Sequence, residues 1–513
     1  MIHADILGER ARLTPGAVAL VDVASGTRYT YGELDARAQR CASWMRGGLG
    51  LGVGDRVGLL AANCVEYVDF IFAAAKSGII LVPLNTRLTS HELGAIARDS
   101  GMRALVYEET FATACLELQQ DSEIERLIPL RGDASASYAS ATGALPDGSF
   151  KAERLSPEHV LALLYTSGTT GKPKGVMLPH RMVAWNAYNT VVSWQLRDDD
   201  VSPVFTPMYH AGGLAVFLTP LFAIGGRIVL HRQFDAGDVW RSIEAERCTV
   251  VLGVPTIWKL LMEDPGFERA DLSSVRWLIS GGAPLPQFIA DTYRRRGVIF
   301  KQGYGLTEVG VNCFAMTPDD SLRKAGSIGK PLMMTEARVA AGDGSEAEAG
   351  AVGELWLRGP HVTSGYWNAP ELTAASLDDQ GWFHTGDVAT RDEEGFYYIA
   401  GRQKDMFISG GVNVYPAEIE AHLLQLDALA DAAVVGVPHP TWGEMGVAFL
   451  VARPGVPRPA TEAVLAYLEE RLARFKLPRA FRFVPVLPRT ASGKVQKAEL
   501  QRLFSEDPDA GLS

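Results

Sequence analysis

The sequence predicts an α/β protein with a large N-terminal domain and a smaller C-terminal one, and three observations lead to this fold class. The chain has 513 residues, 47% of them hydrophobic and 21% charged, which is more than one hydrophobic core usually organises. Apolar runs alternate with amphipathic stretches up to about Phe300, and short alternating segments rich in glycine follow up to Ile399. A new α/β pattern starts after that, so we expect two domains, 1–401 and 402–513.

The first part of the chain predicts a parallel sheet with helices on its faces. Thr30 and Glu33 form a capping box before a helix, residues 55–60 are expected to form a strand, and residues 66–75 a helix. Such a βα alternation is typical of parallel sheets. The polar stretch 132–149 predicts a surface connection without an element of its own.

The later elements follow in order along the chain. Strands are expected at 160–164, 227–230, 250–252 and 277–279. Glycine-rich alternating segments between residues 326 and 399 indicate antiparallel β structure. The three arginines of 294–296 stand before Gly297, and we interpret them as the end of a helix with a glycine cap rather than as a phosphate site.

Composition and charge exclude some classes of protein. The formal charge of -11 argues against nucleic acid as a partner, because duplex binding depends on cationic contacts to phosphate. The longest apolar run, 70–75, is too short to span a bilayer, and the charged N-terminus does not resemble a secretory signal. Five scattered cysteines indicate neither a disulfide framework nor a CxxC metal site. We expect a cytoplasmic protein with no membrane span.

The most informative motif is the loop at 165–175, YTSGTTGKPKG. Its glycines allow backbone amides to approach a phosphate closely, its hydroxyls can donate to phosphate oxygens, and Lys172 and Lys174 can neutralise charge. The spacing differs from a Walker loop, in which four residues separate the glycines and GK[ST] follows. Taken alone, the segment fits an ordinary surface loop equally well.

Further segments follow this loop in a fixed order, at 207–213, 281–284, 302–308, 353–355, 385–387, 401–405 and 488–494. Together with the loop they resemble the adenylate-forming superfamily of acyl-CoA synthetases, luciferases and nonribosomal peptide adenylation domains. Within it the chain is most similar to bacterial fatty acyl-CoA and feruloyl-type aryl-CoA ligases. The resemblance implies two βα-layered sheets plus a β-barrel-like subdomain in the N-terminal domain, and a small mobile α+β C-terminal domain.

The resemblance also implies the reaction. ATP activates a carboxylic acid as an acyl-AMP, and the acyl group then passes to coenzyme A. Because adenylation is an in-line attack on the α-phosphorus, catalysis rests on positioning and charge stabilisation, without a protein nucleophile. The expected cofactors are ATP, magnesium and coenzyme A.

The resemblance assigns the ATP contacts residue by residue. The β- and γ-phosphates are expected on Thr166, Ser167, Gly168, Thr169, Thr170, Gly171, Lys172 and Lys174. One wall of the adenine slot is expected from Gly282, Ala283 and Pro284, and the other from Gln302, Gly303, Tyr304 and Gly305, with the Tyr304 ring able to stack on a purine.

The remaining assignments concern catalysis. Thr307 is expected on the α-phosphate, and Thr166 and Glu308 are expected to hold magnesium. Asp387 and Arg402 are the ribose and nucleotide contacts, and Lys494 bridges the acyl carboxylate and the AMP phosphate during adenylation. Without the resemblance, Tyr304 would be a core tyrosine, Asp387 a turn aspartate and Lys494 a solvated lysine.

The acyl pocket is expected at His210, Gly213, Gly281, Val309 and Gly310. A carboxylic acid with a pKa of about 4 is already ionised near neutrality, so His210 is interpreted as a wall rather than a base. The small residues leave room for a medium- or long-chain fatty acid, with a cinnamate- or ferulate-like ring as the alternative.

The second half-reaction is expected to use a different arrangement of the domains. The resemblance implies a hinge at Lys404 and a pantetheine tunnel lined at Gly410 and Gly411. It also implies a coenzyme A surface that includes Trp442; the alternative for Trp442 is a role in packing alone. Two alternative functions stay open here: an enzyme that loads a carrier protein and a nucleotide-binding module without activity. The oligomeric state stays open as well, with a homodimer as a candidate.

Overall fold

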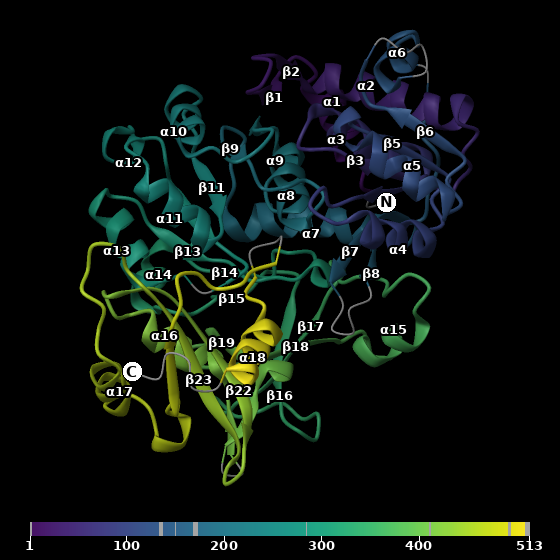
Figure 1. Cartoon of the computed structure of the whole chain (residues 1–513). Helices are drawn as coiled ribbons and strands as arrows, with labels where there is room; N and C mark the ends of the chain where they lie inside the picture. The colour runs from purple at the N-terminus through teal and green to yellow at the C-terminus, as the bar shows by residue number, and fades with distance from the viewer. Residues whose placement is uncertain are drawn as a thin grey trace.

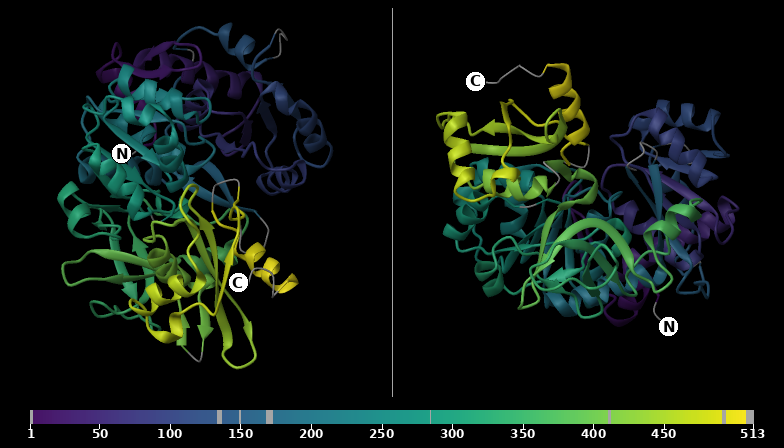
Figure 2. Two further views of the ribbon diagram at one scale, coloured as in Figure 1. Left: turned by 60° about the vertical axis from the view of Figure 1, so that its left-hand side comes forward. Right: turned by 90° about the horizontal axis from the view of Figure 1, so that it is seen from below.

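The computed structural model describes residues 3–132, 137–148, 150–167, 173–283, 285–409, 412–490 and 494–507. Figure 1 shows the N-terminal part as several α/β layers, and Figure 2 shows the C-terminal part as a smaller body beside them. No helix of the described ranges is long and apolar enough to cross a membrane.

One sheet carries the start of the predicted phosphate loop. Its strands run in the order β6 (Arg126–Pro129), β5 (Ala104–Tyr107), β3 (Arg56–Leu60), β4 (Ile80–Pro83), β7 (Val160–Ser167) and β8 (Pro173–Pro179). All are parallel except β8, which pairs antiparallel to β7. The sheet packs with α3 (Val65–Ser77), α4 (Ser90–Ser100) and α5 (Ala112–Gln120), and α6 (Tyr138–Gly143) contacts α2 (Tyr31–Ser43). The predicted parallel βα pattern is confirmed here.

A second layer lies beside the first. Its strands are β2 (Arg28–Thr30), β1 (Val18–Asp22), β10 (Arg227–Leu230) and β9 (Val201–Val204), followed by β11 (Val250–Gly253), β12 (Trp277–Ser280) and β13 (Phe300–Gln302). The pairings within it are parallel except that of β2, which is antiparallel to β1. The amide of Thr249 donates to the carbonyl of Val201 at 2.8 Å, which joins the two groups of strands.

Helices cover this second layer (Figure 1). They are α1 (Ile6–Leu13), α2 (Tyr31–Ser43), α7 (His180–Trp194), α8 (Ala211–Ala215), α9 (Leu218–Ile224), α10 (Ala236–Ala245), α11 (Pro255–Glu263), α12 (Gly266–Arg269) and α13 (Gln287–Arg295). α2 begins at the predicted capping box, in which the Thr30 and Glu33 side chains each accept from the other residue's amide. α13 ends before Gly297, whose φ of 78° confirms the predicted glycine cap.

The glycine-rich region forms the predicted antiparallel sheet. Its strands are β16 (Glu336–Ala340), β17 (Gly353–Arg358), β18 (Phe383–Arg391) and β19 (Tyr397–Arg402) in this order, with α15 (Pro370–Ser376) between β17 and β18. α14 (Pro318–Arg323) and a short pair, β14 (Phe314–Ala315) with β15 (Lys330–Pro331), precede it, and a bridge from Gly329 to Tyr397 connects this pair to the sheet edge. Among the described strands the sheet is open rather than a closed barrel.

The C-terminal part has its own sheet and core. A single 3-10 turn, η4 (Gln403–Asp405), leads from β19 into β20 (Phe407–Ser409), which is followed by β21 (Val412–Val414), β22 (Leu429–His439), β23 (Gly443–Ala452) and β24 (Ala480–Phe483). The helices are α16 (Pro416–Leu423), α17 (Thr461–Glu469) and α18 (Lys497–Glu506). This is the predicted α+β composition, and the domain boundary at 401/402 stays a prediction.

The predicted surface connection at 132–149 was wrong in part, because α6 lies within it. The α6 residue Tyr138 is 3% exposed, and its hydroxyl donates to Asp69 at 2.8 Å. This contact reaches 69 residues back along the chain, so the small polar residues around Tyr138 did not reveal it.

Lys301 on β13 gives a testable consequence of burial. The side chain is 7% exposed with its ammonium 4.1 Å from the centroid of the Trp277 ring, and burial followed by the charge of Arg276 lowers its pKa to about 8. Unfolded lysine titrates near about 10.4, so between these values the folded state binds fewer protons and stability rises with pH. Lys301→Met should therefore raise the free energy of unfolding at pH 7 by up to about 3 kcal/mol. Loss of the cation–π contact with Trp277 reduces this gain.

Chemical denaturation at pH 7 and pH 10.5 measures this effect. The gain from Lys301→Met should shrink at the higher pH, whereas the exposed Lys330→Met should show no comparable pH-dependent gain. A loss of stability in Lys301→Met that is equal at both pH values would contradict the prediction.

Candidate active site

The two predicted walls of the adenine slot meet at one edge of the second layer. Residues 281–283 follow β12 and residues 303–305 follow the neighbouring parallel strand β13. The side-chain amide of Gln302 donates to the backbone carbonyl of Ala283 at 3.2 Å. The backbone amide of Gly303 donates to the carbonyl of Ser280 at 2.7 Å. Ligands of open α/β sheets bind at such carboxyl ends.

Gly305 brings the next segment into this edge. A Cβ atom at this position would lie 2.0 Å from the carbonyl oxygen of Val311, so only glycine allows the two backbones to approach so closely. The chain then turns into η3 (Thr307–Val309), and Gly310 follows with a φ of 83°. This turn places Thr307 and Glu308 directly after the adenine wall.

Asp387 on β18 contacts two other residues that are predicted to bind the nucleotide, Tyr304 and Arg402. Its carboxylate accepts from the Tyr304 hydroxyl at 2.6 Å and pairs with the Arg402 guanidinium at 3.0 Å. The β18–β19 register sets Asp387 opposite Arg402. Burial raises the pKa of Asp387, and the charge of Arg402 and the Tyr304 hydrogen bond act against this rise. Tyr304 and Arg402 therefore hold the buried Asp387 carboxylate beside the predicted adenine wall.

Lys494 comes from the C-terminal part and lies at this same site. The charged groups that act on it are Arg402, Glu308, Asp387 and Lys404. The Lys494 side chain is exposed to solvent. The protein around its ammonium nevertheless lowers the pKa of Lys494 by desolvation, and the charge of Arg402 lowers it further. Of these groups, Glu308 and Asp387 lie more than a hundred positions before Lys494 in the chain, and the role of Lys494 stays a prediction.

Glu308 and Lys174 lie on either side of a tyrosine that the sequence did not indicate. The hydroxyl of Tyr366 donates to Glu308 at 3.0 Å, and the ammonium of Lys174 lies 5.7 Å from the Tyr366 ring centroid. Lys174 pairs with Thr166 across the β7–β8 hairpin. No spacing connects Tyr366 with Glu308, which lies 58 residues away; its only signal is an aromatic residue with a hydroxyl in a Gly-Tyr-Trp segment.

His210 lies at the start of α8 with a buried ring nitrogen, Nε2, that has no hydrogen-bond partner among the described residues. Burial, the charge of Lys494 and that of Arg87 lower the pKa of His210 to about 4. A neutral, weakly basic imidazole fits the expected role as a wall of the acyl site and is a poor proton acceptor near pH 7.

The small residues of the expected acyl pocket differ in the space that they leave. A Cβ at Gly213 would lie 2.4 Å from the Pro207 carbonyl oxygen, and one at Gly310 would lie 3.1 Å from that of His361. Val309 is fully buried in a cluster with Cys313 and Phe314. Gly213 and Gly310 therefore allow close backbone packing on their Cβ side, and the room that these positions leave for an acyl chain stays a prediction. At Gly281 an added Cβ would meet nothing within 4 Å.

Some predicted residues lie outside the described ranges: Gly168, Thr169, Thr170, Gly171, Lys172, Pro284, Gly410 and Gly411, and the side chain of Ser167. Lys404 lies in η4 and is exposed. Trp442 lies between β22 and β23 at 41% exposure, with the Arg479 guanidinium 5.2 Å from its ring centroid. Trp442 is therefore accessible rather than a core residue.

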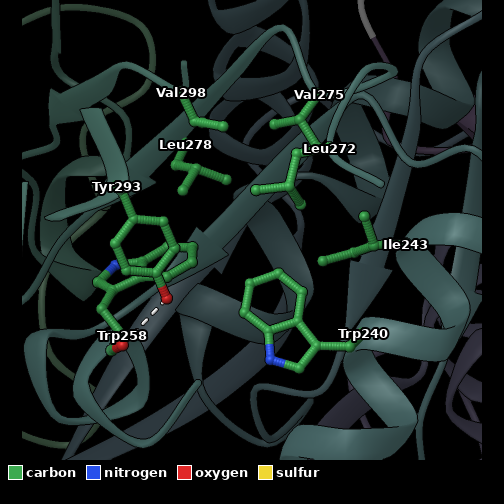
Figure 3. A pocket seen from close by; sticks show the side chains of 8 residues that line it. All are labelled: Trp240, Ile243, Trp258, Leu272, Val275, Leu278, Tyr293 and Val298. Carbon is green, nitrogen blue, oxygen red and sulfur yellow. Dashed lines mark hydrogen bonds between the residues drawn. The ribbon is translucent and has the colours of Figure 1, made fainter. Parts of the chain in front are cut away.

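Two hollows of the molecule lie elsewhere. Figure 3 shows eight side chains around a gap of about 10 Å³, where the Tyr293 hydroxyl donates to the Trp258 carbonyl at 3.0 Å. This gap is about the size of one water and belongs to the core. A cavity of about 360 Å³ lies at the amino ends of β9 to β12, opposite the candidate site, where Arg227 pairs with Glu246 and Arg276 with Asp200.

Comparison with known proteins matches this arrangement to a family. The AMP-binding enzyme family matches residues 7–367, and the AMP-binding enzyme C-terminal domain matches residues 418–494. A feruloyl-CoA synthase from an Amycolatopsis species is 40% identical over 96% of this chain and 97% of its own. The long-chain-fatty-acid–CoA ligase FadD13 of Mycobacterium tuberculosis is 35% identical over 98% of both chains. The ATP-bound structure of MatB from Rhodopseudomonas palustris superposes with a TM-score of 0.90 at 32% identity, covering 98% of this chain and 99% of its own.

The chain therefore belongs to the AMP-binding enzyme family and has its fold. It is an AMP-forming acyl-CoA synthetase that uses ATP and coenzyme A to convert a carboxylic acid into its thioester.

Proposed function

We propose that the described arrangement carries out the first half-reaction, with the observed residues in the predicted roles. The observation that carries the proposal is the position of Lys494 beside Glu308, Asp387 and Arg402. A carboxylate oxygen attacks the α-phosphorus and pyrophosphate leaves. Lys494 stabilises the charge that develops between the acyl carboxylate and the α-phosphate, a contribution that preorganised cations make in the transition state.

In this proposal the Asp387 carboxylate accepts the ribose hydroxyls. Tyr304 and Arg402 hold its two oxygens at 2.6 and 3.0 Å, which fixes its direction before ATP binds. Thr307 faces the α-phosphate at the turn made possible by Gly305. The second half-reaction follows when the thiol sulfur of coenzyme A attacks the acyl carbon, AMP leaves and the thiol proton is released.

Magnesium fits the residues at the Glu308 side of the site. The ion usually takes one or two protein oxygens and completes its shell with phosphates and water. No cluster of three or more ligating side chains occurs among the described residues, which agrees with a metal held mainly by the nucleotide. When bound, magnesium would neutralise phosphate charge; Glu308 and Thr166 are the proposed protein ligands.

For the acid we propose an apolar carboxylic acid of six carbons or more. The segments expected around the acyl group, 185–188, 209–213, 281 and 309–311, contain no lysine or arginine, so a second carboxylate would lack a partner there. The identity of 35% to a long-chain-fatty-acid–CoA ligase supports a medium- or long-chain fatty acid as the first candidate. The identity of 40% to a feruloyl-CoA synthase supports a cinnamate-like ring as the second candidate.

The test is kcat/KM for thioester formation with acetate, hexanoate, octanoate, dodecanoate, benzoate, ferulate and malonate. Each methylene that becomes buried should improve an alkyl acid by up to about 0.8 kcal/mol, or about fourfold, until the site is full. A best substrate among the apolar acids of six carbons or more is expected. The charge of Arg87 also reaches His210, so malonate is the critical comparison: a preference for malonate or acetate would overturn the proposed acid class.

A further inference from the structure

The ring of Tyr366 lies between two residues of the candidate phosphate site that carry opposite charges. Its hydroxyl donates to Oε1 of Glu308 at 3.0 Å, and its ring centroid is 5.7 Å from the ammonium of Lys174. The residue is 7% exposed. Within the described residues no ion pair joins Lys174 to Glu308. The two charges therefore share one aromatic neighbour without neutralising each other.

The backbone around Tyr366 is fastened to the strand that carries Lys174. Tyr366 forms an antiparallel bridge with Val176, the amide of Trp367 donates to Gly175 at 2.8 Å, and the amide of Met177 donates to Gly365 at 3.0 Å. The same segment reaches Glu308, whose carbonyl accepts from the amide of Thr363 at 2.8 Å. Tyr366 thus has a fixed place relative to both charged groups.

We propose that Tyr366 is a positioning residue, which orients the Glu308 carboxylate for magnesium and keeps it apart from Lys174. The inference rests on the proposed function, since it takes Glu308 as the magnesium ligand. A direct pair between Lys174 and Glu308 would neutralise both before ATP arrived, and binding of magnesium–ATP would then have to break it. The hydroxyl occupies one oxygen of Glu308 and leaves the other oxygen for the metal.

The geometry of the Tyr366 hydroxyl agrees with this role, since it donates to the Glu308 carboxylate at 3.0 Å. A hydrogen bond to a charged group is among the stronger ones in proteins, so its removal should be measurable.

The experiment is a calorimetric titration of the full chain with ATP, in magnesium and in EDTA, for wild type and Tyr366→Phe. The variant keeps the ring and loses only the hydroxyl. We expect the Kd for ATP in magnesium to rise about tenfold, a typical effect of losing a hydrogen bond to a charged group. The Kd in EDTA should change less than about twofold, on the same reasoning. Tyr366→Leu, which also removes the ring from Lys174, should weaken ATP binding in both conditions.

Tyr138→Phe is the matched control. The Tyr138 hydroxyl also donates to a buried carboxylate, that of Asp69 at 2.8 Å, in a part of the N-terminal layers that carries none of the proposed nucleotide contacts. Its ratio of Kd values with and without magnesium should equal that of wild type, and melting temperatures check that each variant is folded. The inference is overturned if Tyr366→Phe keeps the wild-type ratio, or if it weakens binding equally in both conditions. If the wild type itself does not bind ATP, the proposed function fails instead.

Discussion

Replacing Lys494 by alanine is expected to lower acyl-AMP formation by at least about 100-fold, the scale for losing one preorganised group that acts on transition-state charge. The charges of Glu308, Asp387 and Arg402 all act on Lys494. Because the proposed contact exists while the carboxylate attacks phosphorus, its loss should be selective. Conversion of supplied acyl-AMP and coenzyme A to the thioester should be largely kept.

Pyrophosphate exchange measures the first half-reaction, and single-turnover thioester formation from acyl-AMP measures the second. Lys497→Ala is a suitable control, since Lys497 also carries a cation near the start of α18 but pairs with Glu420 at 2.8 Å within the C-terminal part. The control should affect neither half-reaction by more than a few-fold, as expected for a surface pair. Equal loss of both half-reactions in Lys494→Ala would refute the assigned role.

Local signals in the sequence predicted the elements well, whereas contacts between distant elements required the structure. The capping box at Thr30 depends on two residues three positions apart. β17 (Gly353–Arg358) lies within the region predicted to be antiparallel, because its alternating residues and flanking turns are local signals. The α6 helix was missed because its stability comes from Tyr138 and a distant carboxylate.

The same distinction between local signals and distant contacts holds for the candidate site. Asp387, Arg402 and Glu308 stand in motifs that the resemblance identified, but the hydrogen bond from Tyr304 to Asp387 spans 83 residues and no spacing predicts it. Tyr366 contributes a hydroxyl to a site formed by other segments, so a single sequence offers no reason to select it. The amount of free space at Gly213 and Gly310 also depends on backbone packing from elsewhere.

The passage from one half-reaction to the other is proposed to use Lys404. The chain leaves the β16–β19 sheet at Arg402 and enters the C-terminal sheet at Phe407, with only η4 and Met406 between them. Lys404 itself is exposed, so its side chain does not restrain this turn. Arg402, by contrast, is held by Asp387 at 3.0 Å, which places the change of direction after the nucleotide contact. A hinge of a few residues between two sheets can absorb such a rotation.

Lys404→Pro is expected to block thioester formation from supplied acyl-AMP by about 100-fold or more, the scale of misplacing reacting groups, with acyl-AMP formation still measurable. Proline fixes φ near about -65°, a value that a 3-10 turn such as η4 tolerates but that prevents a large rotation at this position. Proline also disfavours a helical Gln403, so adenylation should fall too, by no more than about tenfold, or ~1.4 kcal/mol. Lys404→Ala removes the same ammonium and keeps the backbone free, and it should leave both half-reactions within a few-fold of wild type. Thioester formation that is unchanged in Lys404→Pro, or equally lost in Lys404→Ala, would show that rotation at this residue does not connect the two steps.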